Sequence, residues 1–134
     1  MQFKDIIYEV KSDYAHVTIN RPKVLNAFTP VTLQELKTAL DSAEKDKNVG
    51  VIVLSGAGDR AFCAGGDMNW ESSKEFQDHE YEFHIHLTKC SKPIIAKVDG
   101  YAIGGGNHMA YFCDLTIASE NSIFGQNGPR VGSP

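Results

Sequence analysis

The sequence YAIGGGNH at residues 101–108 is typical of a short strand that ends at three glycines and continues directly into a helix. Glycine lacks a Cβ, so a run of glycines lets the backbone turn sharply and bring its N–H groups close to a bound group. The first N–H groups of a helix have no partner within it, and the helix dipole favours negative charge there. The stretch therefore predicts either a site for an oxygen that develops negative charge, or a turn needed only for strand–helix packing.

A second glycine stretch, AGGD at residues 64–67, also follows a short predicted strand. Residues 51–67, 94–107 and 114–128 each have the pattern of an apolar strand, a tight turn, a short strand and a glycine-bearing loop. A unit of this kind cannot bury its own apolar face and must stack on its neighbours. We therefore expect a coil of strand–strand–helix turns, in which the N–H groups of Gly66 and Gly105 point at one spot. Two such donors would stabilise an enolate or a tetrahedral oxyanion.

The other segments complete an α/β chain. Apolar runs at residues 6–10 and 16–19 predict a hairpin, and residues 21–28 predict a loop. Thr32, with Glu35 three residues later, has the pattern of a capping box, which predicts a helix over residues 32–46. Residues 71–90 predict an irregular loop that leads into an amphipathic helix.

Length and composition indicate the class of protein. The chain has 134 residues, of which 42% are hydrophobic, as expected for a single domain with a real core. A net charge of -4 with scattered Lys and Arg argues against a nucleic-acid partner. Three cysteines without a ligand pattern predict buried free thiols in a reducing compartment. The absence of a signal-peptide pattern and of a membrane-spanning run predicts a cytoplasmic protein with no membrane contact.

A metal site is not predicted from the histidines. His79, His84 and His86 have spacings that could bind a metal, but no set of Cys or carboxylate residues in the sequence completes a site around them. Asp67 is interpreted as a helix cap rather than as an acid.

Four motifs resemble the crotonase (enoyl-CoA hydratase/isomerase) superfamily in their order and spacing: RP with NA within residues 21–27, AFCAGGD at 61–67, GYAIGGG at 100–106 and CDLTIA at 113–118. The resemblance spans essentially the whole chain. It implies a truncated ββα superhelix, the ClpP/crotonase spiral, with residues 1–134 as the N-terminal part of the core domain. It also implies a coenzyme A thioester as substrate, no covalently bound cofactor, and a homotrimer or hexamer at full length.

The resemblance also implies positions for the site. The oxyanion-hole donors fall on Gly66 and Gly105. Coenzyme A is expected to lie along three segments, with contacts at Lys23, Leu25, Ala64, Gly65, Asp67, Met68, Tyr101, Ala102, Ile103 and Gly104.

Two departures from the family pattern bear on the reaction. Hydratases of this family carry two glutamates, at positions that hold His108 and Gly128 in this chain. Adding water across a double bond needs a positioned acid and base, so hydration is not favoured. His108 is either a replacement base or a residue that only packs and bonds locally.

The segment FGQNGPRVGS at residues 124–133 resembles the branch that contains 1,4-dihydroxy-2-naphthoyl-CoA synthase and 2-ketocyclohexanecarboxyl-CoA hydrolase. The resemblance implies space at Gly128, which in the synthase admits bicarbonate as the base beside Gln126, and substrate contacts from Asn127 and Ser133. The base is therefore either a non-protein group such as bicarbonate or a residue beyond position 134. It favours ring-opening hydrolysis of a cyclic β-ketoacyl-CoA. The alternatives are the synthase reaction, an enoyl-CoA hydratase or isomerase, and a non-catalytic CoA-binding relative.

Overall fold

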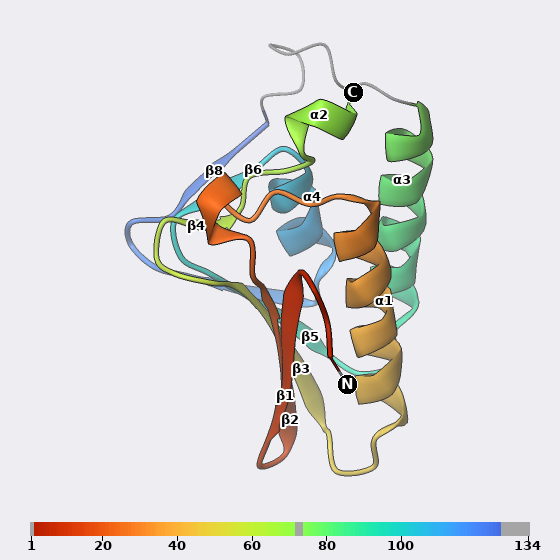
Figure 1. Cartoon of the computed structure of the whole chain (residues 1–134). Helices are drawn as coiled ribbons and strands as arrows, with labels where there is room; N and C mark the ends of the chain where they lie inside the picture. The colour runs from red at the N-terminus through yellow and green to blue at the C-terminus, as the bar shows by residue number, and fades with distance from the viewer. Residues whose placement is uncertain (1, 72–73, 127–134) are drawn as a thin grey trace.

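The computed structural model describes residues 2–71 and 74–126, and in this part of the chain two sheets lie beside a layer of helices (Figure 1). The larger sheet has the strand order β1-β2-β3-β5-β7, and the smaller has the order β4-β6-β8. The strands of the larger sheet are β1 (Ile6–Lys11), β2 (Tyr14–Ile19), β3 (Val51–Gly56), β5 (Ile94–Val98) and β7 (Leu115–Ala118). Those of the smaller sheet are β4 (Ala61–Cys63), β6 (Tyr101–Ile103) and β8 (Ile123–Gly125).

The strand pairings confirm the predicted repeating unit. Each of the long strands β3, β5 and β7 turns into a short strand, and the long strands pair in parallel with one another. The short strands β4, β6 and β8 also pair in parallel. The N-terminal hairpin is antiparallel, as predicted, and joins the larger sheet because β2 pairs in parallel with β3. Corresponding loops of successive turns are thereby stacked on one another.

The helical segments of the described residues lie mainly on one side of the larger sheet, where α1 and α3 run side by side (Figure 1). A 3₁₀ helix, η1, falls within the segment predicted as a loop. The α-helix α3 begins close to the start of the segment for which an irregular loop was predicted. The bounds are η1 (Pro22–Val24), α1 (Pro30–Lys45), α2 (Met68–Glu71), α3 (Lys74–Lys89) and α4 (Gly105–Phe112).

The start of α1 corrects the predicted capping box. Thr29 is the N-cap, and its hydroxyl and that of Thr32 each accept a hydrogen bond from the other residue's N–H, at 3.4 and 3.1 Å. Pro30 occupies the first helical turn, where its missing N–H has no acceptor to lose. The predicted partner, Glu35, instead accepts hydrogen bonds from the N–H groups of Lys4 and Asp5 at 2.8 and 2.7 Å. The helix therefore begins at residue 30, and Glu35 anchors the chain segment before β1.

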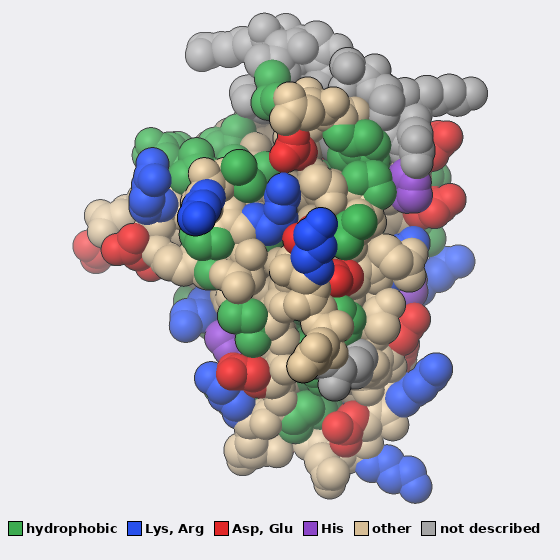
Figure 2. Space-filling view, viewed as in Figure 1, with side chains coloured by type: hydrophobic (Ala, Val, Ile, Leu, Met, Phe, Trp, Pro, Cys, Tyr) green, Lys and Arg blue, Asp and Glu red, His purple; other side chains and the backbone are tan. Residues whose placement is uncertain are grey.

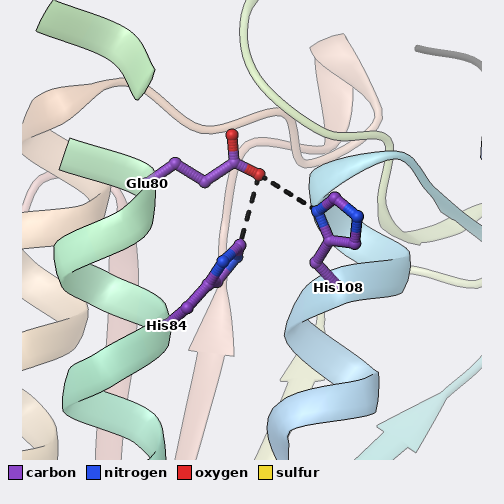
Figure 3. A group of neighbouring side chains, drawn as sticks. All are labelled: Glu80, His84 and His108. Carbon is purple, nitrogen blue, oxygen red and sulfur yellow. Dashed lines mark hydrogen bonds and ion pairs between the residues drawn. The ribbon is translucent and has the colours of Figure 1, made fainter. Parts of the chain in front are cut away.

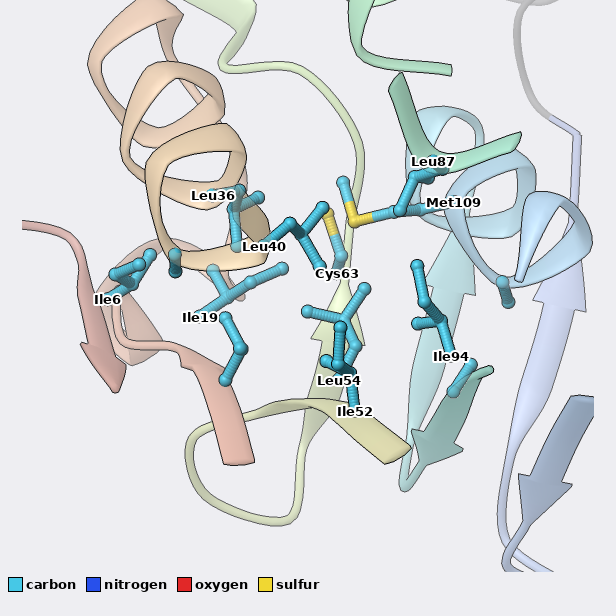
Figure 4. Close-up of a cluster of buried hydrophobic side chains, with 14 of the residues drawn as sticks. Ile6, Ile19, Leu36, Leu40, Ile52, Leu54, Cys63, Leu87, Ile94 and Met109 are labelled. Atoms are coloured by element: carbon cyan, nitrogen blue, oxygen red, sulfur yellow. The ribbon is translucent and has the colours of Figure 1, made fainter. Parts of the chain in front are cut away.

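The core lies between α1, the larger sheet and the facing sides of α3 and α4 (Figure 4). Burying a Leu, Ile or Met side chain contributes roughly 1.5–3 kcal/mol each, so the sum favours this arrangement of layers strongly. The largest fully buried side chains are Phe28, Phe62, Phe83, Ile19, Leu33, Leu36, Leu40, Ile52, Leu54, Ile94 and Met109.

Apolar side chains are exposed on the last described strands. Leu115 and Ile117 of β7 are 62% and 63% exposed, and Ile123 of β8 is 53% exposed. Among the described residues, β7 and β8 are the end strands of their sheets, so this surface is one that a further turn of a coil would cover.

On the face shown in Figure 2, Lys and Arg side chains lie scattered among acidic and apolar ones. None of the helices in the described residues combines the length and apolar character that crossing a bilayer requires.

Candidate active site

A cleft of about 410 Å³ lies between the segment after η1, the loop after β4 and the start of α4. Gly65 and Gly66 line the cleft from one loop, and Gly104 and Gly105 line it from the other. The other lining residues are Val24, Leu25, Ala27, Ala64, Asp67, Met68 and Asn69. The two glycine stretches that the sequence singles out thus meet at one cavity.

Gly65 lies directly against the start of α4. Its φ is +101°, and an added Cβ would lie 3.1 Å from the carbonyl oxygen of Ile103 and 3.4 Å from the amide nitrogen of Gly105. A side chain at this position would be strained by the backbone conformation and crowded by its neighbours, so glycine is the residue that fits. The N–H of Gly104 donates to the carbonyl of Gly125 at 2.9 Å, which ties the end of β8 to the start of α4.

The N–H groups of Gly66 and Gly105 form no hydrogen bond within the described part of the chain. Gly105 is the first residue of α4, and the N–H of a first helical residue has no acceptor inside its helix. Gly66 forms a parallel bridge with Phe28 in which the hydrogen bonds come from the N–H groups of Phe28 and Asp67, leaving the Gly66 N–H outside the ladder. Two such donors lining one cleft are suited to hold an oxygen that carries negative charge.

Asn26 fixes the wall of the cleft that follows η1. The residue is 1% exposed, and its side-chain nitrogen donates to the carbonyls of Ala57 and Ala61 at 3.1 and 2.8 Å, while its side-chain oxygen accepts from the N–H of Arg21 at 2.9 Å. Leu25 and Asn26 both have positive φ, near +57°. The carbonyl of Leu25 can then accept from the N–H of Ala64 at 3.0 Å, which joins this wall to the first glycine loop.

Asp67 acts as a helix cap, as predicted. Its Oδ1 accepts a hydrogen bond from the N–H of Asn69 at 3.0 Å, at the start of α2. Its Oδ2 lies 3.6 Å from Nη1 of Arg21, so the carboxylate is also held by an ion pair. These contacts hold the loop at residues 64–67 in the wall of the cleft.

A cluster of polar side chains lies next to Gly105, between α3 and α4. His108 Nδ1 is 3.5 Å from Glu80 Oε1, and the side-chain nitrogen of Gln126 is 2.8 Å from His108 Nε2. His84 Nε2 is 3.7 Å from the same oxygen of Glu80. Burial, together with the neighbouring His108, lowers the pKa of His84 to about 4, so its imidazole is neutral near pH 7.

The structure brings most of the predicted ligand contacts to the cleft. Those that line it are Leu25, Ala64, Gly65, Asp67, Met68 and Gly104, together with the predicted donors Gly66 and Gly105. Lys23 and Tyr101 are exposed outside the lining, the side chain of Ala102 is buried in the core, and Ile103 approaches the site through its carbonyl. Gln126 contacts His108 rather than the cleft lining. The predicted Asn127, Gly128 and Ser133 lie outside the described residues.

Ala27, Asn69 and Glu80 contribute to the site but were not predicted from the sequence as site residues. Ala27 belongs to one of the family motifs but was not predicted as a contact, and no pattern marked Asn69; both line the cleft beside predicted contacts. Glu80 precedes His84 by one helical turn, a spacing that could have identified the pair. His86 does not join them, because it pairs with Asp41 at 2.8 Å.

Comparisons with known proteins agree with this site and fold. The family model for enoyl-CoA hydratase/isomerase matches residues 9–134. A crystal structure of an enoyl-CoA hydratase/isomerase from Xanthobacter autotrophicus Py2 is 31% identical, with a TM-score of 0.92, over 98% of this chain and 52% of that one. The crystal structure of a putative enoyl-CoA hydratase/isomerase (crotonase) from Legionella pneumophila is 33% identical, with a TM-score of 0.90, over 98% of this chain and 54% of that one.

This chain spans about half the length of these solved structures. Their similarity confirms the predicted α/β crotonase-like coil and is consistent with a chain that contains part of the fold. The family match covers all but the first eight residues of the sequence. The chain therefore belongs to the enoyl-CoA hydratase/isomerase (crotonase) family.

Proposed function

We propose that the protein binds a coenzyme A thioester in the cleft and holds the thioester oxygen between the N–H groups of Gly66 and Gly105. The observation that carries the proposal is that both glycines line one cleft and neither N–H forms a hydrogen bond within the described residues. An enolate forms when a bond at the α-carbon of a thioester breaks, and its oxygen would gain most from two fixed donors. The largely apolar remainder of the lining, including Val24, Leu25 and Met68, is suited to an acyl or pantetheine chain.

The reaction we propose is ring-opening hydrolysis of a cyclic β-ketoacyl-CoA such as 2-ketocyclohexanecarboxyl-CoA. A base removes a proton from a water molecule, and the water oxygen adds to the carbon of the ring ketone. The bond between the former ketone carbon and the α-carbon then breaks, and its electron pair forms the thioester enolate. Protonation of the α-carbon gives a linear dicarboxylic acid attached to coenzyme A. Bicarbonate beside Gln126 is the proposed base, and Asn127 and Ser133 are proposed to orient the ketone or the water.

Support for ring opening over hydration comes from the residues at the two hydratase glutamate positions. These are His108 and Gly128, and neither supplies a carboxylate. His108 lies within hydrogen-bonding distance of Glu80 and Gln126. Position 108 therefore lacks the glutamate with which a hydratase adds water to a double bond.

The test is a parallel assay of 2-ketocyclohexanecarboxyl-CoA and crotonyl-CoA in water enriched in ¹⁸O, with and without bicarbonate, followed by mass spectrometry. We expect the linear product with one ¹⁸O in its new carboxylate, formed faster with bicarbonate, and no hydration of crotonyl-CoA. Hydration of crotonyl-CoA without ring opening would overturn the proposal in favour of a hydratase. Binding of both thioesters without turnover would instead identify a non-catalytic relative.

A further inference from the structure

Three potential metal ligands converge between α3 and α4, next to the oxyanion-hole glycine of α4. Glu80 and His84 lie one turn apart on α3, and His108 faces them from α4 (Figure 3). One ligand atom from each of the three side chains lies within 4.8 Å of the other two, and Glu80 Oε1 is 3.7 Å from His84 Nε2 and 3.5 Å from His108 Nδ1. The side chains of Glu80 and His84 are 16% and 13% exposed, and that of His108 is 36% exposed, so the group is largely shielded from water but reachable from one side.

His84 Nε2 is buried and has no hydrogen-bond partner in the described residues. Leaving a buried polar atom unpaired costs about 1–3 kcal/mol, so such an atom needs an explanation. The His84 ring is held in place because it stacks on Phe112 at 4.9 Å and meets the His108 ring edge-on at 5.4 Å. That nitrogen points towards the carboxylate of Glu80, but at 3.7 Å from Oε1 it is too far away for a hydrogen bond (Figure 3).

We propose that Glu80, His84 and His108 bind a divalent transition-metal cation, with Zn²⁺ as the expected occupant. Two imidazoles and one carboxylate are a ligand set that Zn²⁺ accepts, and three protein ligands leave a fourth position open. A cation among these atoms would give the buried nitrogen of His84 a partner. It would also draw the three ligands together from their present separations of 3.5 and 3.7 Å about the Glu80 oxygen.

The location of this metal site relates it to the cleft. A Cβ added at Gly105 would lie 2.8 Å from Glu80 Oε1, so the carboxylate contacts the residue that lines the cleft. A cation held there could bind a water molecule or a substrate oxygen next to the proposed oxyanion hole. That use rests on the proposed function, whereas the binding of the cation does not.

The same residues also admit an arrangement without metal. Asn107 Nδ2 donates to Gln126 Oε1 at 3.2 Å, which directs the Gln126 amide nitrogen at His108 Nε2 and leaves Nδ1–H to donate to Glu80. This chain of hydrogen bonds does not provide a partner for His84 Nε2. Metal binding requires the other tautomer, in which His108 Nδ1 is the ligand and Nε2–H donates to the oxygen of a rotated Gln126 amide. Such an outer-shell partner is typical of metal-bound histidine.

The experiment is a calorimetric titration of the chelator-treated protein with ZnCl₂, supported by the visible spectrum after addition of CoCl₂. We expect one equivalent of Zn²⁺ to bind and Co²⁺ to give the absorption bands of a four-coordinate site. His84→Ala and His108→Ala should each weaken Zn²⁺ binding by more than about 100-fold, since losing a direct ligand exceeds the 10–100-fold effect of an outer-shell partner. His86→Ala is the matched control, because His86 lies on the same helix but bonds to Asp41.

Glu80→Gln provides a second variant that preserves shape and removes the charge, and it should also weaken binding. Zn²⁺ should raise the melting temperature of the original protein and of His86→Ala, but not that of His84→Ala, because only a folded state with an intact site binds it. Equal Zn²⁺ affinity in the original protein and His84→Ala would overturn the proposal. So would ¹⁵N chemical shifts that show His108 protonated at Nδ1 in the presence of Zn²⁺. None of these measurements uses an acyl-CoA, so they stand apart from the test of the reaction.

Discussion

Gly106 of α4 lies against the backbone carbonyl of Cys63 in β4, so closely that a Cβ at position 106 would overlap the carbonyl oxygen. This contact sets the distance between α4, which begins at the proposed oxyanion hole, and the short strand β4, which leads into the first glycine loop. The position of Gly105 relative to Gly66 therefore depends on the absence of a side chain at the next residue.

Gly106→Ala should destabilise the protein by about 1–3 kcal/mol or more, because the helix must move away from a rigid backbone carbonyl. The free energy of unfolding from urea titration is the measurement. Gly58→Ala is the control, since no atom lies within 4 Å of its added Cβ and only its φ of +79° opposes the change. Equal losses in the two variants would show that the contact with Cys63 does not limit the packing.

Gly105→Pro and Gly105→Ala together isolate the donor from the effect of added volume. Both introduce a Cβ that would meet the ring of Phe28 at 2.6 Å, but only proline lacks the N–H. Proline is tolerated at the first position of a helix. We expect turnover of the ring ketone substrate to be about 100-fold lower in the proline variant than in the alanine variant, the usual loss for one oxyanion donor. Equal turnover in the two would count against Gly105 as a donor.

Asn26→Ala should lower the free energy of unfolding by about 1–3 kcal/mol, because it leaves the buried carbonyl of Ala61 without its side-chain donor. The change also releases the wall of the cleft, so binding of coenzyme A thioesters should weaken. Asn20→Ala is a suitable control, since Asn20 is exposed, and it should change stability by less than about 0.5 kcal/mol. Calorimetric unfolding and a CoA-thioester titration measure the two effects.

The thiols of Cys63, which is buried, and Cys113, which is partly buried, should resist alkylation in the folded protein. Burial raises the pKa of each to about 12, and for Cys113 the nearby Asp114 adds to this effect. The reactive thiolate is therefore nearly absent at pH 8, whereas all three cysteines should react after unfolding. Mass spectrometry after timed exposure to iodoacetamide gives the rates, and rapid modification of native Cys63 would contradict its burial.

The same shifts predict a loss of stability in alkali. In the unfolded chain these thiols ionise near pH 9, whereas in the folded chain they remain protonated up to about pH 12. The unfolded state thus binds fewer protons over that interval, so the free energy of unfolding should fall as pH rises from 9 to 12. Replacing Cys63 and Cys113 together by alanine should reduce this slope relative to the original protein.

Ile117→Lys should reduce self-association of the chain. Ile117 is 63% exposed on the end strand of the larger sheet, where apolar side chains favour contact between copies. Val31→Lys is the control, because Val31 is 45% exposed but lies on α1. Sedimentation velocity at increasing concentration should show less association in Ile117→Lys than in the control.

The repeating strands and the two glycine loops could be predicted because their signals are local. Continuous apolar runs followed by glycine mark β3, β5 and their short partners directly in the sequence. The stacking of these units follows from the need to bury apolar faces. The meeting of Gly65 with Gly105 was thus within reach of sequence reasoning, although the individual contacts were not.

The features that sequence analysis missed depend on tertiary contacts. Thr32 and Glu35 have the spacing of a capping box, but Glu35 is drawn to the N–H groups before β1, and Thr29 takes the cap. Similarly, the sequence spacing of His79, His84 and His86 suggested that these three side chains could act together as metal ligands. The packing of α3 on α4 instead selects His84 and adds His108, which lies far along the chain. No local pattern contains that information.

The alternation along β5 has an evolutionary consequence. Ile94, Ala96 and Val98 point into the core while Lys97 between them is exposed, and the strand is held between β3 and β7. Deleting one residue inside β5 would invert which side chains face inward and would shift every later loop relative to the cleft. An insertion at an exposed loop tip leaves the register of the strands unchanged. New substrate preferences can therefore arise by changes at the loop tips. The paired strands that position those loops tolerate few insertions or deletions.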